Sequence, residues 1–411
     1  MELQQAPPRQ TSTTRHDARR EVVRHLDRLR PQVIMPARGF IRYPYCIPGG
    51  FYEQQWDWDG FFISCHLASR DPARPEYLKY WTLNVLNSVL PDGDVAACIS
   101  TEGVRARLPS LRLKPFLAQG AELAGRLGGD DSWLVPHYDE IVRIVTRREA
   151  SHRDAATGLY AWEDAMSSGA DNNVAVTNDP EARRKMAAAD VNAFQYREYE
   201  ALSRLADRLG HAEDARRFAT MASKLSAAMM KHLWSPDDVS FWTMDLRDGT
   251  WRRRVSYSNF VPLWAGLVPR VHAREMIRRY LWNADHLLSP HGLRSLSARD
   301  PDYNNVNMID PHSNWQGPIW PIVNYFYFTA LVRYGFADEA EELVDRLCRL
   351  YLDDIEFCGS LHENYDAETG RPLAPSADQS ATGREGGFVG WNLLLQDMIE
   401  VVEGREHPLF I

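Results

Sequence analysis

Two carboxylates in separate polar loops are the residues of this chain best suited to acid–base chemistry. Asp171 lies in a Gly-, Ser- and Asn-rich run at 162–173, and Glu363 lies far downstream in the run at 361–370. Tryptophans, of which the chain has 13, stand near both. Hydrolysis of a glycosidic bond needs one carboxyl group to protonate the leaving oxygen and another to activate water. Flat aromatic faces can stack on sugar rings, so the pattern predicts a glycoside hydrolase.

Aromatic residues also gather around an acid in the segment 49–62, where a predicted helix begins. Tyr52, Trp56, Trp58 and Asp59 lie together there, and a carboxylate among aromatic rings can accept hydrogen bonds from two hydroxyls of one sugar. The alternative is that Asp59 only caps the helix. Of the two interpretations, a sugar subsite is the one we favour.

A second pair of tryptophans, Trp315 and Trp320, stands at the start of another predicted helix. Pro318 and Pro321 fit the first turn of that helix, where a missing N–H group costs little. One of the two indoles could simply fill the core. We do not expect both of them to be purely structural.

Positive charge near the predicted site suggests an anionic substrate. Arg197 follows Asp190 by two helical turns and so shares its face, and a loop before residue 115 is basic. That loop carries Arg105, Arg107, Arg112 and Lys114. Solvated surface charge is the alternative explanation, but a bound carboxylate would need such a partner.

Chemistry alone leaves two choices open. Asp164 competes with Asp171 for the role of acid, and Glu385, before Phe388 and Trp391, competes with Glu363 for the role of base.

Helical periodicity dominates the rest of the chain and predicts about a dozen helices. They are expected at 16–30, 59–69, 75–90, 115–127, 132–149, 189–209, 211–234, 258–267, 271–282, 318–335, 337–353 and 388–402. Residues 240–251 give the clearest hairpin signal. Long loops recur at a spacing of roughly sixty residues, and loops this long are usually functional. A ring of helical hairpins with its loops on one rim would explain this spacing. An irregular helical protein with two domains is the alternative.

Composition excludes several classes of protein. The 411 residues carry a net charge of -9, which argues against a nucleic-acid binder. There is no apolar run of membrane-spanning length and no apolar signal segment at the N-terminus. Residues 1–15 are expected to be a disordered tail before a single domain at 16–411. The five cysteines show no metal-binding or disulfide spacing, which is typical of a cytoplasmic protein.

The motifs, taken in order, resemble glycoside hydrolase family 63. Trp-x-Trp-Asp at 56–59, Gly-x-Asp-Asn at 169–172, Asp-x-Asn-Ala at 190–193, Trp-x-Gly-Pro-x-Trp at 315–320 and Glu-Asn-Tyr-Asp at 363–366 span most of the chain. Trehalases of family 37 share a related pattern. The resemblance implies an all-α (α/α)6 barrel and an inverting mechanism. A short chain of this kind is similar to bacterial hydrolases of mannosylglycerate and glucosylglycerate.

The resemblance also implies roles for individual residues. Asp171 matches the general acid and Glu363 the general base, with Arg197 as the partner of a glycerate carboxylate. The predicted substrate-binding set is Tyr52, Trp56, Trp58, Asp59, Gln119, Arg197, Trp315, Gln316 and Trp320. No cofactor or metal is implied, and the expected partner is a small glycoside, with neither nucleic acid nor membrane. A homo-oligomer remains open.

Three other functions are also compatible with the sequence. A trehalase- or kojibiose-type α-glucosidase would use the same two carboxylates. A sugar epimerase on the same barrel would use histidines, for which His152, His312 and His362 lie in long loops. A non-catalytic sugar-binding ring of helices would need neither acid nor base.

Overall fold

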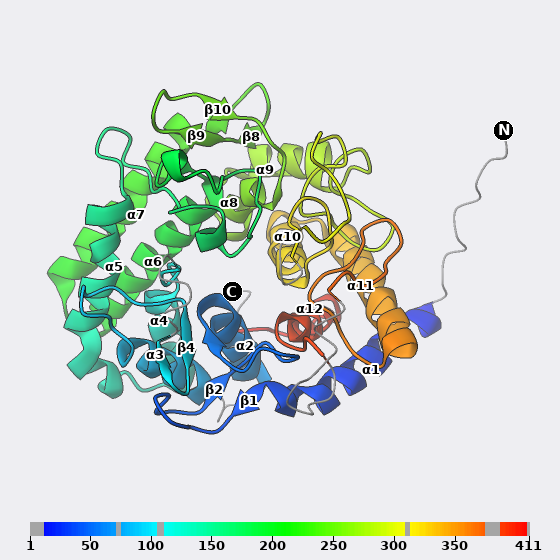
Figure 1. Ribbon diagram of the computed structural model, residues 1–411, viewed down its shortest axis with the longest axis horizontal. Coiled ribbons are helices and arrows are strands. Elements are labelled where there is room, and N and C mark those ends of the chain that lie inside the picture. The colour runs from blue at the N-terminus through cyan, green and yellow to red at the C-terminus, as the bar shows by residue number, and fades with distance from the viewer. Residues whose placement is uncertain (1–11, 71–74, 105–110, 309–312, 375–386, 409–411) are drawn as a thin grey trace.

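A closed inner ring of helices forms the centre of the computed structural model, which describes residues 12–70, 75–104, 111–308, 313–374 and 387–408 (Figure 1). Its members are α2 (Asp57–Arg70), α4 (Leu117–Gly128), α6 (Ala189–Arg208), α8 (Val261–Trp264), α10 (Pro321–Tyr334) and α12 (Leu394–Val402). Each contacts the next, and α12 contacts α2 and so closes the ring. The predicted ring of helical hairpins is confirmed.

An outer layer of helices surrounds this ring. It consists of α1 (Ser12–Leu29), α3 (Glu76–Leu86), α5 (Tyr138–His152), α7 (Ala212–His232), α9 (Arg270–Met276) and α11 (Ala337–Cys358). The sequence decides which layer a helix joins. The outer α7 buries one stripe, Phe218, Ala222, Leu225 and Met229, whereas the inner α10 is buried along nearly its whole length. A helix that is apolar all round has to be covered on every side.

Short helical turns and strands complete the described residues. The turns are η1 (Arg30–Val33), η2 (Ser132–His137), η3 (Met166–Ser168), η4 (Pro180–Ala182), η5 (Tyr257–Phe260), η6 (Ile277–Leu281) and η8 (Trp391–Leu393). The strands are β1 (Ile34–Met35), β2 (Tyr45–Cys46), β3 (Gln55–Trp56), β4 (Cys98–Ser100), β5 (Gly103–Val104), β6 (Met186–Ala187), β7 (Trp234–Ser235), β8 (Ser240–Phe241), β9 (Thr243–Asp245) and β10 (Trp251–Arg252). Trp251 pairs with Met244, which confirms the predicted hairpin, and β6 adds a third strand to it.

The long loops lie before the inner helices, at the N-terminal ends of those helices. They therefore gather at one rim of the barrel, as predicted. The first helix, α1, begins at Ser12, four residues earlier than expected. It packs on α11, where buried Arg19 lies 2.7 Å from Asp345.

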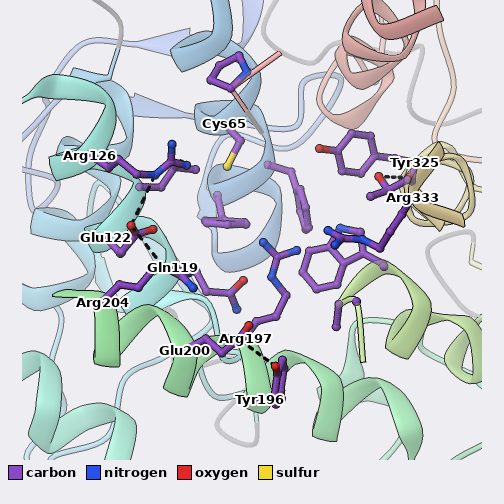
Figure 2. A pocket seen from close by; sticks show the side chains of 18 residues that line it. Cys65, Gln119, Glu122, Arg126, Tyr196, Arg197, Glu200, Arg204, Tyr325 and Arg333 are labelled. Atoms are coloured by element: carbon purple, nitrogen blue, oxygen red, sulfur yellow. Dashed lines mark hydrogen bonds and ion pairs between the residues drawn. The ribbon is translucent and has the colours of Figure 1, made fainter. Parts of the chain in front are cut away.

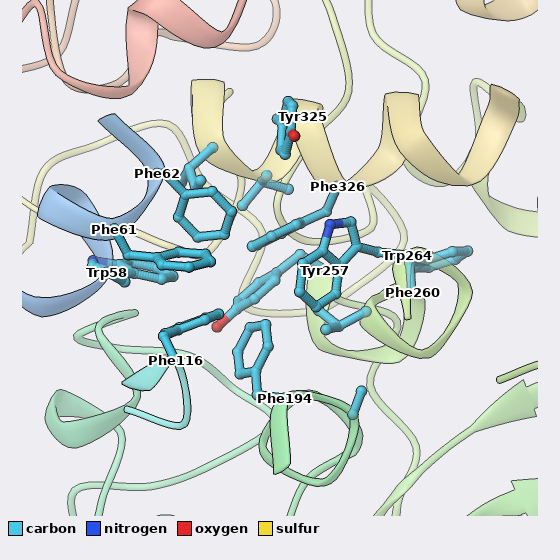
Figure 3. Packing of buried hydrophobic residues seen from close by; sticks show 14 of the residues in the cluster. Trp58, Phe61, Phe62, Phe116, Phe194, Tyr257, Phe260, Trp264, Tyr325 and Phe326 are labelled. Atoms are coloured by element: carbon cyan, nitrogen blue, oxygen red, sulfur yellow. The ribbon is translucent and has the colours of Figure 1, made fainter. Parts of the chain in front are cut away.

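A layer of aromatic side chains crosses the interior of the ring (Figure 3). Phe62 from α2 contacts Phe116 and Phe326, and Phe194 from α6 contacts the same two rings. Ring centroids in these pairs are 4.9 to 5.9 Å apart, the range in which aromatic pairs attract each other. Trp264 of α8 closes the layer against Phe194 and Phe326. The layer separates the two ends of the barrel.

Among the described residues, no helix combines the length and the apolar character that crossing a membrane would require. All five cysteines have free thiols.

Candidate active site

A cavity of about 420 Å³ opens at the rim formed by the N-terminal ends of the inner helices. Eight of the residues predicted to form the site line it, namely Tyr52, Trp56, Trp58, Asp59, Asp171, Trp315, Trp320 and Glu363. They come from the loops before α2, α6, α10 and α12 and from the first turn of α2. The structure thus brings together residues that lie more than 300 positions apart.

Asp59 reaches the cavity because a neighbouring carboxylate holds the start of α2. The helix begins at Asp57, so Asp59 lies inside its first turn and is not a cap. The Asp57 carboxylate accepts hydrogen bonds from the backbone N–H of Trp58 and from the backbone N–H and ammonium of Lys114. With Asp57 fully engaged, the carboxyl group of Asp59 is left to face the cavity.

The Asp171 loop is anchored to the loop that carries Trp315. The side-chain oxygen of Asn172 accepts the backbone N–H of Trp315 at 2.7 Å, and its amide donates to Asn314 at 3.1 Å. Gln316 donates to the backbone carbonyl of Asn172 at 3.1 Å. Gln316 is not among the residues that line the cavity, so its predicted contact with substrate is replaced by a contact that positions the Asp171 loop.

Gly169 allows the Asp171 loop to approach α2 closely. Its φ angle is +82°, and a Cβ atom there would lie 2.8 Å from Cε of Lys114 and 3.0 Å from the Trp58 ring. A larger residue would require Lys114 or Trp58 to shift, and both are buried and line the cavity.

Glu363 is held by a buried network behind it. The Nδ1 atom of His362 lies 2.8 Å from Asp354, and the Tyr365 hydroxyl donates to the same carboxylate at 2.9 Å. The backbone N–H of His362 donates to the Tyr365 hydroxyl. On the cavity side, the Tyr52 hydroxyl lies 3.3 and 3.4 Å from the two carboxylate oxygens of Glu363.

Three acids in this cavity have raised pKa values. Burial raises the pKa of Glu363 well above its usual value, and the charges of Asp59 and Asp171 raise it further. Burial also raises the pKa of Asp171, against smaller effects of Ser313 and Lys114, and it raises the pKa of Asp59 to about 7. Because like charges repel in a dry site, a charge on one of the three acids disfavours ionisation of the others.

Indole rings form the walls of the cavity. Trp315 and Trp320 stack with their centroids 3.9 Å apart, and Trp58 contacts both Trp315 and Trp391. Trp391 and Phe388 were not predicted as site residues, and neither were Phe51 and Gln54, which also line the cavity. The closeness of Phe51 to Tyr52, and the aromatic run at 388–391, are the sequence signals that could have found three of them.

The rival acid and the rival histidines that the structure describes do not line the cavity. Asp164 accepts the backbone N–H of Ser167 and does not line the cavity. His152 and His362 do not line it either, and burial lowers the pKa of His152 to about 2. Glu385 and His312 lie outside the described residues.

The placement of Arg197 and Gln119 at the sugar site is wrong. Both line a second cavity, which lies toward the C-terminal ends of the inner helices (Figure 2). Arg197 follows Asp190 by two turns of α6, which places it roughly 10 Å farther along the helix axis. That distance is enough to put Arg197 on the other side of the aromatic layer. There the Arg197 guanidinium stacks on the ring of Trp264 at 4.0 Å.

Lys114 is the only cation among the described residues that line the first cavity. Its ammonium lies 3.0 Å from Asp57 and 5.1 Å from the centre of the Trp58 ring. Arg112, from the same basic loop, pairs instead with Asp94. The described part of the cavity therefore has no cation without a carboxylate partner.

Comparisons with known proteins identify relatives. A model of the mannosylglycerate hydrolase MGH1-like glycoside hydrolase domain matches residues 52–382. A mannosylglycerate hydrolase from Rubrobacter radiotolerans is 28% identical over 170 residues, which are 41% of this chain and 36% of that protein. A periplasmic trehalase from Citrobacter koseri is 22% identical over 89% of this chain and 69% of its own length.

Solved structures agree on the fold. The family 63 mannosylglycerate hydrolase from Thermus thermophilus, in complex with Tris and D-glycerate, has a TM-score of 0.68 at 19% identity, covering 94% of this chain and 100% of that one. The neutral trehalase Nth1 of Saccharomyces cerevisiae has a TM-score of 0.66 at 15% identity, covering 89% and 76%. The family match extends over most of the chain and includes Asp171 and Glu363. The chain therefore belongs to the mannosylglycerate hydrolase MGH1-like glycoside hydrolase family.

Proposed function

We propose that this protein is an inverting hydrolase of a small α-linked glycoside, with Asp171 as general acid and Glu363 as general base. The observation that carries this proposal is the cavity itself. Two half-buried carboxyl groups from different loops face one aromatic-walled space of about 420 Å³. That volume is within the range of pockets that enclose a small ligand.

The reaction in this scheme is a single displacement. In this scheme Asp171, whose pKa is raised by burial, gives its proton to the glycosidic oxygen as that bond breaks. Glu363 takes a proton from a water molecule, whose oxygen attacks the anomeric carbon from the opposite face. The sugar leaves with its anomeric configuration inverted. This mechanism requires the two carboxyl groups to be about 6.5–9.5 Å apart, so that water fits between them.

Tyr52 supports Glu363 in the role of base. Burial raises the pKa of the Tyr52 phenol well above its usual value, so the hydroxyl keeps its proton and donates to Glu363. A hydrogen bond to the charged form of an acid favours that form. The bond therefore counteracts part of the effect of burial and helps Glu363 to be ionised when substrate arrives.

The sugar ring would lie against the indole walls, with Asp59 accepting hydrogen bonds from its hydroxyls. This arrangement matches the chemistry of carbohydrate sites, in which apolar ring faces stack and polar edges bond. Asp59 is 6% exposed and lines the cavity, so a sugar bound there would be placed to donate hydrogen bonds to its carboxyl group. We assign it, with Trp58 and Trp315, to the subsite of the sugar that is released.

For the leaving group we propose glycerate, because relatives from Rubrobacter and Thermus carry the name mannosylglycerate hydrolase. Lys114 is the described cation nearest to that role. Its pairing with Asp57 favours a second candidate, a neutral α-linked disaccharide such as trehalose, which needs no free cation. The periplasmic trehalases that match 89% of this chain agree with the second candidate.

Incubation of the purified protein with mannosylglycerate, glucosylglycerate, trehalose and kojibiose tests both candidates. Released sugar is quantified, and proton NMR in the first minutes identifies the anomer formed. We expect turnover of a glycerate substrate and a β-anomer as first product. Turnover of trehalose alone would favour the second candidate, and a first product with the α-configuration would overturn the inverting mechanism.

A further inference from the structure

The second cavity, at the opposite end of the barrel, has the composition of an anion-binding site. Its volume is about 500 Å³. Among the described lining residues, the charged ones are Arg126, Arg197, Arg204 and Arg333 together with Glu122 and Glu200. Four guanidinium groups against two carboxylates leave an excess of two positive charges in one concave space. Figure 2 shows the Arg197 and Arg333 side chains reaching into it from different helices.

The two carboxylates are already engaged. Glu122 is buried and lies 3.6 Å from both Arg126 and Arg204. Glu200 accepts the hydroxyl of Tyr196 at 2.7 Å. Neither of these carboxylates forms an ion pair with Arg197 or Arg333. No other described residue forms a hydrogen bond or an ion pair with those two guanidinium groups.

Arg197 is the informative member of the group because it is half-buried. Its only described contact of note is the face of Trp264, which leaves its N–H groups directed into the cavity. Burial, together with the neighbouring Arg333 and Arg204, lowers the pKa of Arg197 to about 10. A half-buried charge without an ion-pair partner is costly, and the positive neighbours increase that cost more than the more distant charge of Glu200 reduces it.

The helix dipole does not explain how the positive charge of Arg197 is stabilised. A cation gains from the helix dipole only in the last turn, and α6 continues about three turns beyond Arg197, to Arg208. Arg333 does lie in the last turn of α10. Its guanidinium lies against the backbone of Gly266, where a Cβ atom would be 2.9 Å from Nη1. Both groups therefore converge on the same space from the inner helices α6 and α10.

From this arrangement we propose that the second cavity binds a small dianion of the phosphate type, with Arg197 at its floor and Arg333 at its mouth. A planar guanidinium matches the oxygen geometry of a phosphate through paired N–H donors. An excess of two charges suits a dianion better than a monoanion. The aromatic layer keeps this ligand apart from the carboxylates of the catalytic cavity.

Isothermal titration calorimetry at constant ionic strength tests the proposal on the full chain. The probes are inorganic phosphate, methyl phosphate, malonate and acetate. We expect one saturable site for a phosphate-type dianion and at least tenfold weaker binding of acetate. Binding of methyl phosphate as tight as that of phosphate would point to a phosphate ester as the natural ligand, and exclusion of methyl phosphate would point to the free ion. Absence of saturable binding of either phosphate probe would overturn the proposal.

Variants then locate the site. Replacing Arg197 and Arg333 together by Gln should weaken phosphate binding by about ten- to a hundredfold or more, because each removes charge-assisted hydrogen bonds. Arg278→Gln is the matched control, since Arg278 also stacks on an aromatic ring, that of Phe336 at 5.7 Å, but lies outside this cavity. It should bind phosphate as the parent does. If the double variant does not fold, Arg197→Lys and Arg333→Lys keep the charge, and each should show a smaller loss. Unchanged affinity in the folded variants would reject the assignment.

Discussion

Removal of one hydroxyl group should move the acidic limb of the pH–rate profile. The Tyr52 hydroxyl lies 3.3 and 3.4 Å from the carboxylate oxygens of Glu363 and favours the ionised form. A hydrogen bond to a charged group contributes about 1.5–3 kcal/mol, and these long distances place this bond at the lower end. Since about 1.4 kcal/mol corresponds to one pKa unit, Tyr52→Phe should raise the pKa of Glu363 by about one unit.

The sign follows from the role of the base. Glu363 must be ionised to accept a proton from water, so activity is lost as pH falls through its pKa. A higher pKa therefore shifts the acidic limb of kcat/KM toward higher pH, by about one unit, while the rate on the plateau changes much less. The measurement is kcat/KM of the best substrate between about pH 4 and pH 9.

Tyr138→Phe is the matched control for this variant. Tyr138 is another tyrosine whose hydroxyl donates to a carboxylate, that of Asp214 at 2.8 Å, but it lies on α5, away from the cavity. Its removal should leave the limb in place. An acidic limb of Tyr52→Phe that stays fixed, or that moves toward lower pH, would refute the assignment of Glu363 as the base.

Three further outcomes are expected. Asp171→Asn and Glu363→Gln should each lower kcat by about 10²–10⁴-fold with circular dichroism unchanged; a loss of only a few-fold would reassign the roles. Asp59→Asn should shift the acidic limb toward lower pH, opposite to Tyr52→Phe, because it removes a negative charge that raises the pKa of Glu363; an unshifted limb would show that the two acids are not coupled. Arg19→Ala should lower the free energy of unfolding in urea by about 3 kcal/mol, since it leaves a buried carboxylate on α11 without its main partner, whereas the exposed Arg20→Ala should change it by less than about 1 kcal/mol.

The ring of helices was predictable because hydrophobic periodicity survives in nearly every helix. Predicted and observed bounds of α6 differ by one residue. Loop lengths predicted the closure of the ring, since each long loop precedes an inner helix. The very short strands, most of them two residues long, could not be predicted, because pairing between distant segments decides where they form.

The positions of site residues were easier to predict from the sequence in loops than on helices. Isolated acids in polar loops narrowed the candidates to Asp164 or Asp171 and to Glu363 or Glu385, and only the family resemblance favoured Asp171 and Glu363. Arg197 was misplaced because sequence spacing gave its face on the helix but not the depth of the aromatic layer. Gln316 was misassigned because a glutamine can bind either a ligand or a neighbouring loop, and only the fold brings Asn172 within its reach.

The aromatic layer has a consequence for the order in which products leave. Since Phe62, Phe194 and Phe326 close the barrel beneath the catalytic cavity, both halves of a cleaved substrate must depart through the same mouth. The half nearer the floor is trapped until the outer half has gone. Release is then sequential. The inner product binds to the empty cavity and so competes directly with fresh substrate. The outer product binds only while the inner product is still in the cavity. The sugar that accumulates during turnover would thereby slow its own production.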